Sequence, residues 1–568
     1  MPGILPVLIV GAGPAGLVAA LALAQNGIKL RLVDKAERPH VGNRGFGVQP
    51  RTCELFQILG ILDDFLERAT PIPTMRAYKL PGGTVPVKTW DLYPKTGAWP
   101  DRPFGNGLCL DQSELEDILR RHLAKYGVEV EYGHGLVDIE QMLSSVKATV
   151  AVFNDGKATP EREIITSQYL IGTDGARGAT RKLLELTFQG ETRDADGMVW
   201  GDVEIEGLTT EYWHIWGKPG SYTIMARPIR PDGKKFGIGI TGLNFDPAEL
   251  ADEEKVKQFF FKETGRTDLI FGKFSWLSYF RPNMRMVNKF REGRAFVAGD
   301  SGHVHSPTGG QGMNCSVQDS SNIAWKLSMV LKNIAAPTLL DSYNEERLPV
   351  IAQMLQATGS LYTHTVPKAG ETLGQTPSTE IATEEDDRKS GWFRWRNNAL
   401  EMYGINYRFS DIVLEERKSR RPDPEDQIAR AYDGYEGQGT LVAGDRAPQA
   451  PGLVQEDGTD TSLFELFRIN LHTVLIFVTK VLPENVSLAK KWKQSIVQVF
   501  VITGDNITEG FEIEHATRLR DHGGYANAAY RIEDGLTVVV VRPDGFVGAI
   551  GKDLEIVDRY FAKVSKSE

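Results

Sequence analysis

The chain contains 568 residues, 41% of them hydrophobic and 25% charged, which is the composition of a globular protein and not of a disordered, collagen-like or membrane protein. A single hydrophobic core stops growing at roughly 250 to 300 residues, so we expect two or three domains. The net charge of −10, from 65 basic and 75 acidic residues without a long block of one sign, argues against a nucleic-acid partner.

Cysteine usage and hydropathy restrict the compartment. The three cysteines, Cys53, Cys109 and Cys315, lie far apart in the chain, so neither a disulfide framework nor a zinc cluster is expected. Residues 4–10 are apolar but run directly into glycines, as a strand does and a signal peptide does not. No apolar run reaches the roughly 18 residues that a membrane span requires. We therefore expect a cytoplasmic protein without membrane contact.

The chain opens with a strand, a helix and a second strand, over residues 6–10, 17–27 and 28–34. The turn between the first strand and the helix carries Gly11, Gly13 and Gly16, with Ala15 before the last glycine. In a dinucleotide-binding turn the first glycine permits the tight turn, the second lets the backbone approach the diphosphate, and the third lets helix pack on strand.

The ends of these elements complete a nucleotide site. The helix N-terminus supplies unpaired amides and a positive dipole end for a diphosphate. Asp34, followed by Lys35, ends the second strand and is placed to bind the adenosine ribose. A second copy of the glycine spacing, at Gly237, Gly239 and Gly242, lies inside an alternating strand and has no helix after it, so we assign it to a sheet.

The rest of the chain changes texture several times. Helical spacing continues over residues 51–66 and 112–126, and residues 190–276 consist of short alternating runs rich in aromatics, which predict a mostly antiparallel sheet. Strand and glycine-loop character returns near residue 293, helical patterns dominate from 339 to 432, and new strands begin near 442. We expect the divisions 1–189 (with 76–107 on the substrate side), 190–285, 286–365, 366–438 and 439–568.

A second glycine-rich signature follows the strand that ends at Gly299 and Asp300. Asp300 could hydrogen-bond the ribityl or ribose of a nucleotide. Pro307, Gly309, Gly310 and Gly312 would let the backbone approach a flat ring, and the helix after them would stabilise negative charge on a flavin. His303 and His305 lie in the same loop, but no carboxylate or cysteine cluster surrounds them in the sequence, so no metal is expected.

Four segments together resemble the class A flavin-dependent aromatic hydroxylases: GAGPAG with Asp34, RGFGVQPRTCELFQILGILDDF, GTDGARGATRK and GRAFVAGDSGHVHSPTGGQGMN. The resemblance covers about residues 1–360. GDRAPQAPGLV and VVVVRPDGFVG, near the end of the chain, are similar to the phenol hydroxylase branch, whose chains end in a thioredoxin-like domain. The last domain has no CxxC pair, so we expect it to serve as a scaffold or homodimer contact.

The resemblance implies an α/β protein: a Rossmann-like FAD-binding domain interrupted by a mostly antiparallel substrate sheet, then a helical segment and a C-terminal thioredoxin-like α/β domain. It also implies roles for individual residues. Arg44, Gln112, Asp174, Gly175, Arg177, Met313 and Asn314 occupy the positions that contact FAD in the family.

The activity that the resemblance implies is hydroxylation of a phenolic or similarly activated aromatic. NADH or NADPH would reduce FAD, dioxygen would add at C4a, and the hydroperoxyflavin would transfer one oxygen to the ring. Phenol hydroxylases carry an aspartate where this chain has Phe46, so the usual base is missing. Candidates for the substrate pocket lie on the predicted sheet: Tyr222, Tyr279 and Arg227 as catalytic residues, and Trp213, His214 and Trp216 beside them.

Other classes of flavoprotein fit the sequence less well. The WxWxIP signature of halogenases is absent, an epoxidase of lipids would want a membrane-binding helix, and Baeyer–Villiger enzymes or disulfide reductases would need a second dinucleotide fold or a CxxC. Other flavin monooxygenations, such as epoxidation or oxidative decarboxylation of a secondary metabolite, stay open. So does a flavin-binding scaffold without catalysis.

Overall fold

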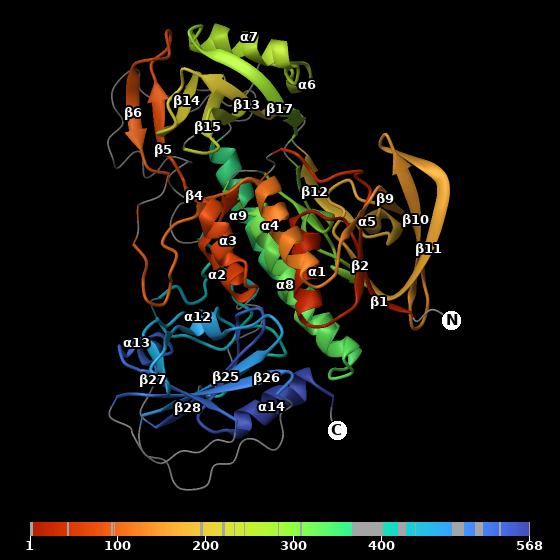
Figure 1. Ribbon diagram of the computed structural model, residues 1–568, viewed down its shortest axis with the longest axis vertical. Coiled ribbons are helices and arrows are strands. Elements are labelled where there is room, and N and C mark those ends of the chain that lie inside the picture. The colour runs from red at the N-terminus through yellow and green to blue at the C-terminus, as the bar shows by residue number, and fades with distance from the viewer. Residues whose placement is uncertain are drawn as a thin grey trace.

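The computed structural model describes residues 4–42, 45–92, 95, 97–192, 197–218, 222–231, 233–242, 245–281, 283–306, 309–365, 401–417, 428–437, 439–479, 494–505, 515–532 and 535–566. Three units are stacked along the long axis of Figure 1. We call them the first unit (residues 4–192 and 283–365, without β5 and β6), the second unit (β5, β6 and residues 197–281) and the C-terminal unit (residues 401–566). The predicted α/β class is confirmed.

A parallel sheet forms the centre of the first unit. Its strands lie in the order β20 (Ala295–Val297), β11 (Lys157–Gly172), β1 (Leu5–Val10), β2 (Leu30–Asp34) and β8 (Val130–Tyr132), with β19 (Arg291–Glu292) at one edge and an antiparallel extension of β11 through β10 (Val146–Asn154) and β9 (His134–Gln141). The chain therefore returns to this sheet after the second unit, because β20 pairs in parallel with β11.

Helices cover the parallel sheet. α1 (Pro14–Gln25) is almost entirely small and apolar, and it packs between α8 (Gly312–Leu331) and α4 (Gln112–Ala124). Small side chains allow this close packing of helix on helix and helix on strand. The other elements of the unit are α2 (Pro50–Ile58), α3 (Leu62–Arg68), α5 (Thr180–Leu183), η1 (Gly299–Ser301), η2 (Pro337–Leu340), α9 (Asp341–Thr365), β3 (Gly47–Val48), β4 (Thr70–Pro71), β7 (Leu108–Cys109), β12 (Phe188–Thr192), β18 (Asn283–Val287) and β21 (His303–Val304).

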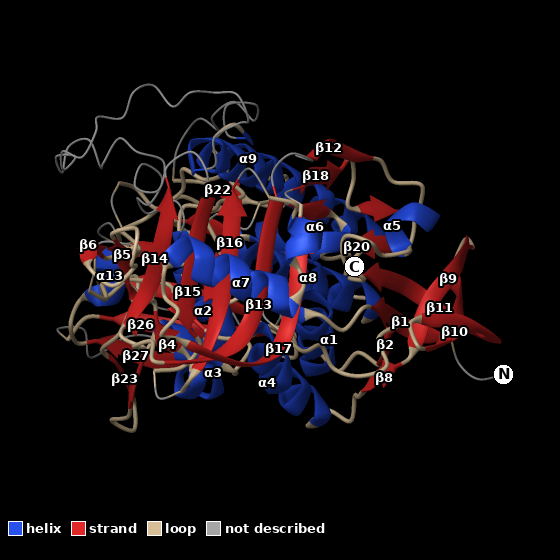
Figure 2. Ribbon diagram, turned by 90° about the horizontal axis from the view of Figure 1, so that it is seen from above, coloured by secondary structure: helices blue, strands red, loops and turns tan. Residues whose placement is uncertain are grey.

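The second unit is one sheet, antiparallel except where β14 runs parallel to β5. Its order is β17 (Ile270–Phe280), β13 (Gly197–Glu206), β16 (Lys235–Gly242), β15 (Tyr222–Pro228), β14 (Tyr212–Lys218), β5 (Thr74–Tyr78) and β6 (Pro86–Trp90). α6 (Pro247–Leu250) and α7 (Glu253–Thr264) cover one face, which Figure 2 shows from above. The other face is turned toward the first unit. One face of the sheet is therefore covered by helices, and the other, which we call the inward face, points to the first unit.

The C-terminal unit is a second mixed sheet. Its strands are ordered β22 (Leu414–Glu415), β29 (Val547–Gly551), β28 (Leu536–Val541), β25 (His472–Val478), β26 (Val497–Thr503), β27 (Thr517–Asp521), β23 (Leu453–Gln455) and β24 (Asp460–Thr461), with helices α12 (Leu463–Leu466), α13 (Tyr525–Ala529) and α14 (Glu555–Val564). The central β25 is buried along its whole length and runs parallel to β26 and antiparallel to β28.

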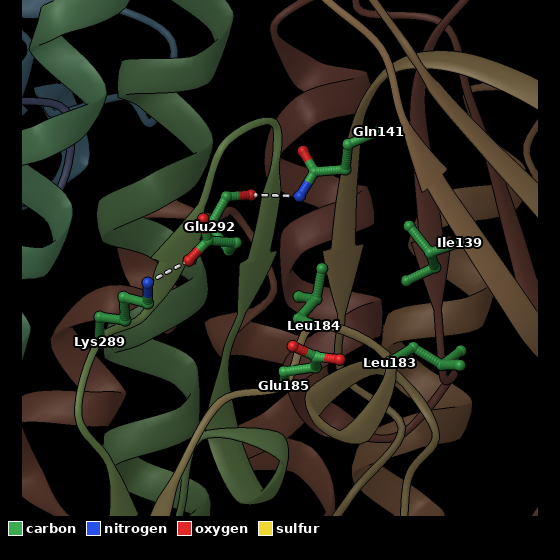
Figure 3. Close-up of a pocket in the computed structure, with 7 residues that line it drawn as sticks. All are labelled: Ile139, Gln141, Leu183, Leu184, Glu185, Lys289 and Glu292. Atoms are coloured by element: carbon green, nitrogen blue, oxygen red, sulfur yellow. Dashed lines mark hydrogen bonds and ion pairs between the residues drawn. The ribbon is translucent and has the colours of Figure 1, made fainter.

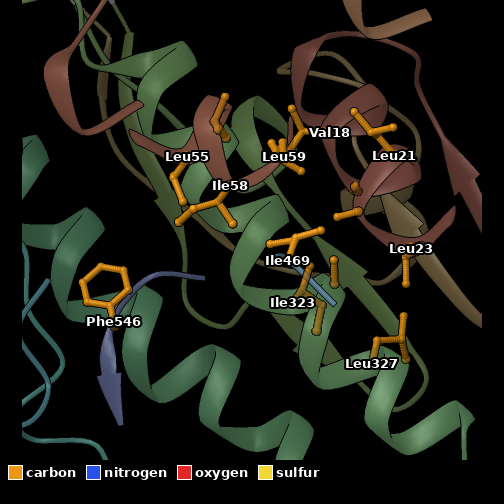
Figure 4. Close-up of a cluster of buried hydrophobic side chains, with 14 of the residues drawn as sticks. Val18, Leu21, Leu23, Leu55, Ile58, Leu59, Ile323, Leu327, Ile469 and Phe546 are labelled. Carbon is orange, nitrogen blue, oxygen red and sulfur yellow. The ribbon is translucent and has the colours of Figure 1, made fainter. Parts of the chain in front are cut away.

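One hydrophobic core joins the C-terminal unit to the first unit. It includes Val18 of α1, Ile58 of α2 and Ile323 of α8 together with Ile469 and Phe546 from the C-terminal unit (Figure 4). Burial of such side chains contributes roughly 1.5–3 kcal/mol each. The two units are therefore packed as one body rather than joined by a linker. Among the described residues, no helix is both long and apolar enough to cross a membrane.

Candidate active site

The turn between β1 and α1 requires its glycines for different reasons. Gly11 has φ +105°, and a Cβ there would lie 2.4 Å from the carbonyl oxygen of Thr173. A Cβ on Gly16 would lie 1.9 Å from the carbonyl oxygen of Gly11. At Gly13, by contrast, a Cβ would meet no described atom within 4 Å. Gly11 and Gly16 thus make the turn, and Gly13 leaves open space where α1 begins.

The acid at the end of β2 fixes the same turn. The Ala12 N–H donates to Asp34 Oδ2 at 2.6 Å, and the Ala36 N–H donates to Asp34 Oδ1 at 2.7 Å. A carboxylate has about four acceptor positions, so Asp34 retains capacity for sugar hydroxyls. Lys35 beside it is exposed, and Ala15 is buried in the first turn of α1. The sequence placed these residues at one location, and the structure brings them together.

The DG segment, residues 173–181, is tied to the loop after β20. Asp174 Oδ2 accepts from the Thr180 N–H (2.9 Å), and Asp174 Oδ1 accepts from the Ser301 hydroxyl (2.9 Å). The Gly175 N–H donates to the same hydroxyl at 2.9 Å, and Gly175 has φ +78°. Asp174 therefore organises two loops, whereas Arg177 and Asp300 are exposed nearby.

The loop at residues 309–314 is fastened to the loop at 45–49 by Asn314. This buried amide accepts from the Gln49 N–H at 2.8 Å and donates to the carbonyl oxygens of Gly47 (2.9 Å) and Gly310 (2.6 Å). Gln49 Nε2 in turn donates to Gly309 O at 3.2 Å. The Asn314 side chain thus holds two loops together.

Small or flexible residues line the same loop region. A Cβ on Gly45 would lie 3.7 Å from Met313 Cβ, so these residues face each other. Gly310 has φ +61°, and a Cβ on Gly312 would lie 2.6 Å from His305 Nε2. Gln112 is the first residue of α4, where its side chain donates to Glu116 at 2.8 Å. The candidates Arg44 and Pro307 lie outside the described residues.

An apolar cluster fills the space between the 45–49 loop and the inward face of the second unit. Its members are Phe46, Ile72, Met75, Trp90, Leu92, Trp200, Trp213, Ile215 and Met225. The Phe46 and Trp213 rings meet edge to face at 5.8 Å. Edge-to-face packing suits two aromatic quadrupoles. The cluster is a wall of large, soft side chains beside the 309–314 loop.

Arg227 joins this wall through its charge. Its guanidinium carbon lies 3.8 Å from the centroid of the Phe46 ring, and Nη2 lies 3.9 Å from Asp111 Oδ1. The buried Asp202 is close by, since a Cβ on Gly237 would lie within 4 Å of both Asp202 and Arg227. Burial, helped by Asp111, raises the pKa of Asp202 to about 6, while Lys235 and Arg227 oppose the rise.

Tyr222 and Tyr279 do not lie with Arg227. Along β15 the side chains of Tyr222, Ile224 and Ala226 belong to the core under α7, whereas Met225 belongs to the inward cluster. The Tyr222 hydroxyl donates to Glu263 O of α7 at 3.3 Å, and burial raises its pKa. Tyr279 is opposite Val199 of the same α7-side core and is 45% exposed. Strand alternation therefore separates both tyrosines from Arg227.

His214 and Trp216 also face α7, and both are fully buried. His214 Nε2 lies 2.7 Å from Thr209 O, so this nitrogen donates and Nδ1 accepts from the Tyr78 hydroxyl at 2.7 Å. Burial lowers the pKa of His214 to about 4. The imidazole is thus a neutral structural element of the sheet. Trp213, one residue earlier, is the member of this trio that faces inward.

The two histidines of the glycine loop have structural contacts. His303 Nε2 is 2.7 Å from Asp319 Oδ2, which also accepts from the Gly299 N–H at 2.9 Å. Arg347 donates to the other oxygen of Asp319 at 2.7 Å. His305 is held by the Ser306 carbonyl, and burial lowers its pKa to about 4. Neither ring faces an arrangement of ligands within the described part of the chain.

A hollow of about 340 Å³ lies elsewhere on the first unit, and Figure 3 shows its lining. Lys289 pairs with Glu292, and Gln141 donates to the Glu292 carbonyl at 2.8 Å. The remaining lining residues are Ile139, Leu183, Leu184 and Glu185. None of these residues belongs to the glycine turn, the DG segment or the 309–314 loop, so the hollow is separate from the site.

Comparisons with known proteins identify the family of this chain. A family model described as FAD binding domain matches residues 5–358. A flavin-dependent monooxygenase of Mycobacteroides abscessus is 30% identical over 98% of this chain and 99% of that protein. The chain belongs to the FAD-dependent monooxygenases.

Other proteins are similar to this chain over shorter spans or in fold alone. The 6-methylpretetramide 4-monooxygenase of Streptomyces rimosus is 34% identical over 62% of this chain and 60% of its own. The flavin-dependent monooxygenase PieE, solved with FAD and substrate, shares the fold with a TM-score of 0.77 at 24% identity, covering 99% of both chains. Aklavinone-11 hydroxylase has a TM-score of 0.72 at 21% identity, covering all of both chains.

FAD is the cofactor of this monooxygenase, and the described residues fit it. The open space at Gly13, the α1 N-terminus and the acceptor positions of Asp34 suit a dinucleotide. Sequence reasoning missed Thr173, Ser301 and Gln49, which fasten the loops to one another. Their partners are 126 or more residues away in the chain, so no local pattern reported them.

Proposed function

We propose that this FAD-dependent monooxygenase hydroxylates a phenolic or similarly activated aromatic ring between the 309–314 loop and the inward face of the second unit. The observation that carries the proposal is the wall of Phe46, Trp213 and Met225 with the buried Arg227 guanidinium against it. An apolar wall with one placed charge is the usual character of a site for a flat organic ligand.

We also propose the placement of FAD. The diphosphate would lie at the α1 N-terminus, the adenosine ribose at the end of β2, and the ring beside the 309–314 loop. The residues proposed to contact it are Gly11, Gly13, Ala15, Gly16, Asp34, Lys35, Arg44, Gln112, Asp174, Gly175, Arg177, Asp300, Pro307, Gly310, Gly312, Met313 and Asn314. The structure supports this at three members: Asp34 accepts a hydrogen bond from the glycine turn, Asp174 accepts one from Ser301 in the loop after β20, and Asn314 donates one to the 45–49 loop.

FAD, reduced by NADH or NADPH, supplies the activation of dioxygen. The chain's own contribution begins with Arg227, whose guanidinium is charged across physiological pH and would stabilise a bound phenolate. This electrostatic stabilisation would replace the aspartate base that phenol hydroxylases carry where this chain has Phe46. The apolar cluster would keep water from the reacting ring. Of the three catalytic candidates, Arg227 is thus the one we retain.

The size of the wall favours a fused-ring substrate over a simple phenol. Three tryptophans and two methionines belong to the inward cluster, and methionine adapts to irregular ligands. The names of similar proteins agree in kind: they include 6-methylpretetramide 4-monooxygenase, tetracenomycin A2 monooxygenase-dioxygenase and rifampicin monooxygenase, although pentachlorophenol 4-monooxygenase is among them as well.

A paired substrate screen tests the function. Purified holoenzyme is mixed with NADH or NADPH and with 1-naphthol or 1-hydroxyanthraquinone, and each is compared with naphthalene or anthraquinone. We expect the two phenols, and not the parent compounds that lack the hydroxyl group, to accelerate cofactor oxidation and to yield a hydroxylated product. A yellow protein that no phenol stimulates would instead favour the flavin-binding scaffold.

The finer architecture belongs to the same proposal. We divide the chain at 1–189, 190–285, 286–365, 366–438 and 439–568, and residues 366–400 of this division lie outside the described residues. A thioredoxin-like C-terminal fold is supported by β25 between parallel and antiparallel neighbours and by the β28–β29 hairpin that leads to α14. A homodimer and a cytoplasmic location stay predictions.

A further inference from the structure

One turn of the C-terminal unit, residues 542–546 between β28 and β29, contacts three helices of the first unit. The turn closes on itself, because Arg542 donates to both carboxylate oxygens of Asp544 and the Gly545 N–H donates to Arg542 O at 2.9 Å. Arg542, Asp544 and Phe546 are at most 2% exposed. We call this segment the 542–546 turn.

The turn contacts α2 through the Arg51 side chain. Arg51 Nη2 donates to the carbonyl oxygens of Asp544 (2.9 Å) and Gly545 (3.2 Å), while Nη1 pairs with Glu54 at 2.7 Å. The Arg51 guanidinium also lies over the Phe546 ring at 4.8 Å. Because α2 begins directly after Gln49, this contact holds the helix whose first residues carry the 45–49 loop.

The turn contacts α8 and α9 as well. Asp544 Oδ2 accepts from Trp325 Nε1 at 3.1 Å and from Asn322 at 3.3 Å, both on α8. Arg542 donates to both oxygens of Glu346 on α9, at 2.7 and 2.9 Å. Burial alone raises the pKa of Glu346, but Arg542 and Lys326 outweigh burial and hold the pKa below its usual range. α8 begins at the 309–314 loop, so the turn is connected to that loop through this helix.

A third connection leads to the loop after β20. The Phe546 ring packs on Tyr407 at 4.4 Å, and the Tyr407 hydroxyl accepts from Arg347 at 2.9 Å. Arg347 donates to Asp319 of α8, which accepts from the Gly299 N–H. Each step is a buried contact. The loop that contains Asp300 is therefore fastened to the same turn.

We propose that the 542–546 turn is a positioning element for FAD. It fixes the 45–49 loop, the 309–314 loop and the loop after β20 relative to one another, which gives the C-terminal unit a role in holding FAD. The inference rests on the proposed placement of FAD. A network of buried ion pairs holds a single geometry, because breaking one partner leaves a charge uncompensated. Displacement of the turn should thus move α2 and α8, and the flavin loops with them.

Gly545 offers the sharpest perturbation. It has φ +71°, and a Cβ there would lie 2.8 Å from Ile58 Cδ1 and 3.1 Å from Arg51 Nη2. Gly545→Ala therefore pushes the turn from α2. Gly458→Ala is the matched control, because Gly458 also has positive φ (+85°) in the C-terminal unit but has no described atom within 4 Å of a Cβ. Both variants carry the same kind of backbone strain.

The experiment measures FAD release from full-length holoenzyme by the fluorescence of free FAD on dilution. We expect Gly545→Ala to raise the Kd for FAD about tenfold and Gly458→Ala to leave it within about twofold. Hydrogen exchange of residues 309–318 should accelerate in Gly545→Ala and not in Gly458→Ala. Arg51→Lys, which keeps the charge beside Glu54 but shortens the reach to the turn, should act like Gly545→Ala and decides the matter if that variant does not fold.

Gly13→Ala serves as the check on the flavin site itself. If Gly13→Ala does not weaken FAD binding, the placement of FAD is wrong. If it does, but Gly545→Ala and Arg51→Lys bind FAD and exchange amides as the wild type does, the positioning role of the turn is refuted. Equal losses in Gly545→Ala and Gly458→Ala would refute it as well, since general destabilisation would then explain both.

Discussion

Gly13→Ala and Gly16→Ala place a methyl group at two glycines of the same turn and should have opposite effects. We expect the first to weaken FAD binding and the second to lower the free energy of unfolding. Gly13 has φ −72° and ψ −177°, which any residue adopts, and open space surrounds its Cβ position. We expect its replacement to change the free energy of unfolding of the flavin-free protein by less than about 0.5 kcal/mol. A methyl group at Gly16 would stand 1.9 Å from Gly11 O, so we expect a loss of about 3 kcal/mol or more there.

Binding should show the reverse contrast. The methyl group of Gly13→Ala would occupy space proposed for the FAD diphosphate and should weaken FAD about a hundredfold, or about 2.7 kcal/mol. Urea unfolding of the deflavinated proteins and FAD titration by flavin fluorescence measure the two quantities separately. A Gly13→Ala protein that binds FAD as tightly as the wild type would refute the placement of the diphosphate.

Three further predictions concern the site. Arg227→Met should lower substrate-stimulated cofactor oxidation at least tenfold, without loss of bound FAD, because a phenolate would lose its positive partner. Asp202, with its pKa raised to about 6, holds its proton more tightly when folded, so its stabilising contribution is present at low pH and is lost as pH rises through about 6. Asp202→Asn should therefore be more stable than wild type by about 3 kcal/mol near pH 8, with no such gain near pH 4, in urea unfolding. Asn314→Ala should cost about 2–4 kcal/mol in the same assay and loosen FAD, because two loops lose their shared hydrogen bonds.

Particular results would contradict each of these. If every phenol stimulates Arg227→Met as it does the wild type, the guanidinium charge has no role in the reaction. An Asp202→Asn stability gain that does not depend on pH would show that packing and not ionisation is responsible. Asn314→Ala with normal FAD affinity would confine that residue to a role outside the flavin loops.

The glycine turn and the acid after it were predictable because their signal is local. Gly11, Gly13 and Gly16 lie within one turn, and Asp34 ends the next strand, so spacing alone locates them. The two-residue period of strands could also have separated Tyr222 from Arg227, since they are five positions apart on one strand and therefore point to opposite faces. Only the tertiary structure could show which of these two side chains points toward the first unit.

Contacts between distant segments were beyond the sequence. Asn314 looked like a residue beside the flavin ring, and its binding of the 45–49 loop depends on a partner 265 residues away. The RPDGF segment attracted notice only as a family resemblance. Its contacts with Arg51 and Glu346 span 494 and 196 residues, and the burial that makes such ion pairs decisive exists only after folding.

This monooxygenase should insert one atom of dioxygen into an aromatic ring. The most direct measurement is a turnover of holoenzyme with NADPH or NADH and 1-hydroxyanthraquinone under isotopically heavy dioxygen, followed by product mass. We expect a product that exceeds the substrate mass by one heavy oxygen atom, with the label absent when only the water is heavy. Cofactor oxidation that yields hydrogen peroxide and unchanged aromatic for every phenol tested would contradict it.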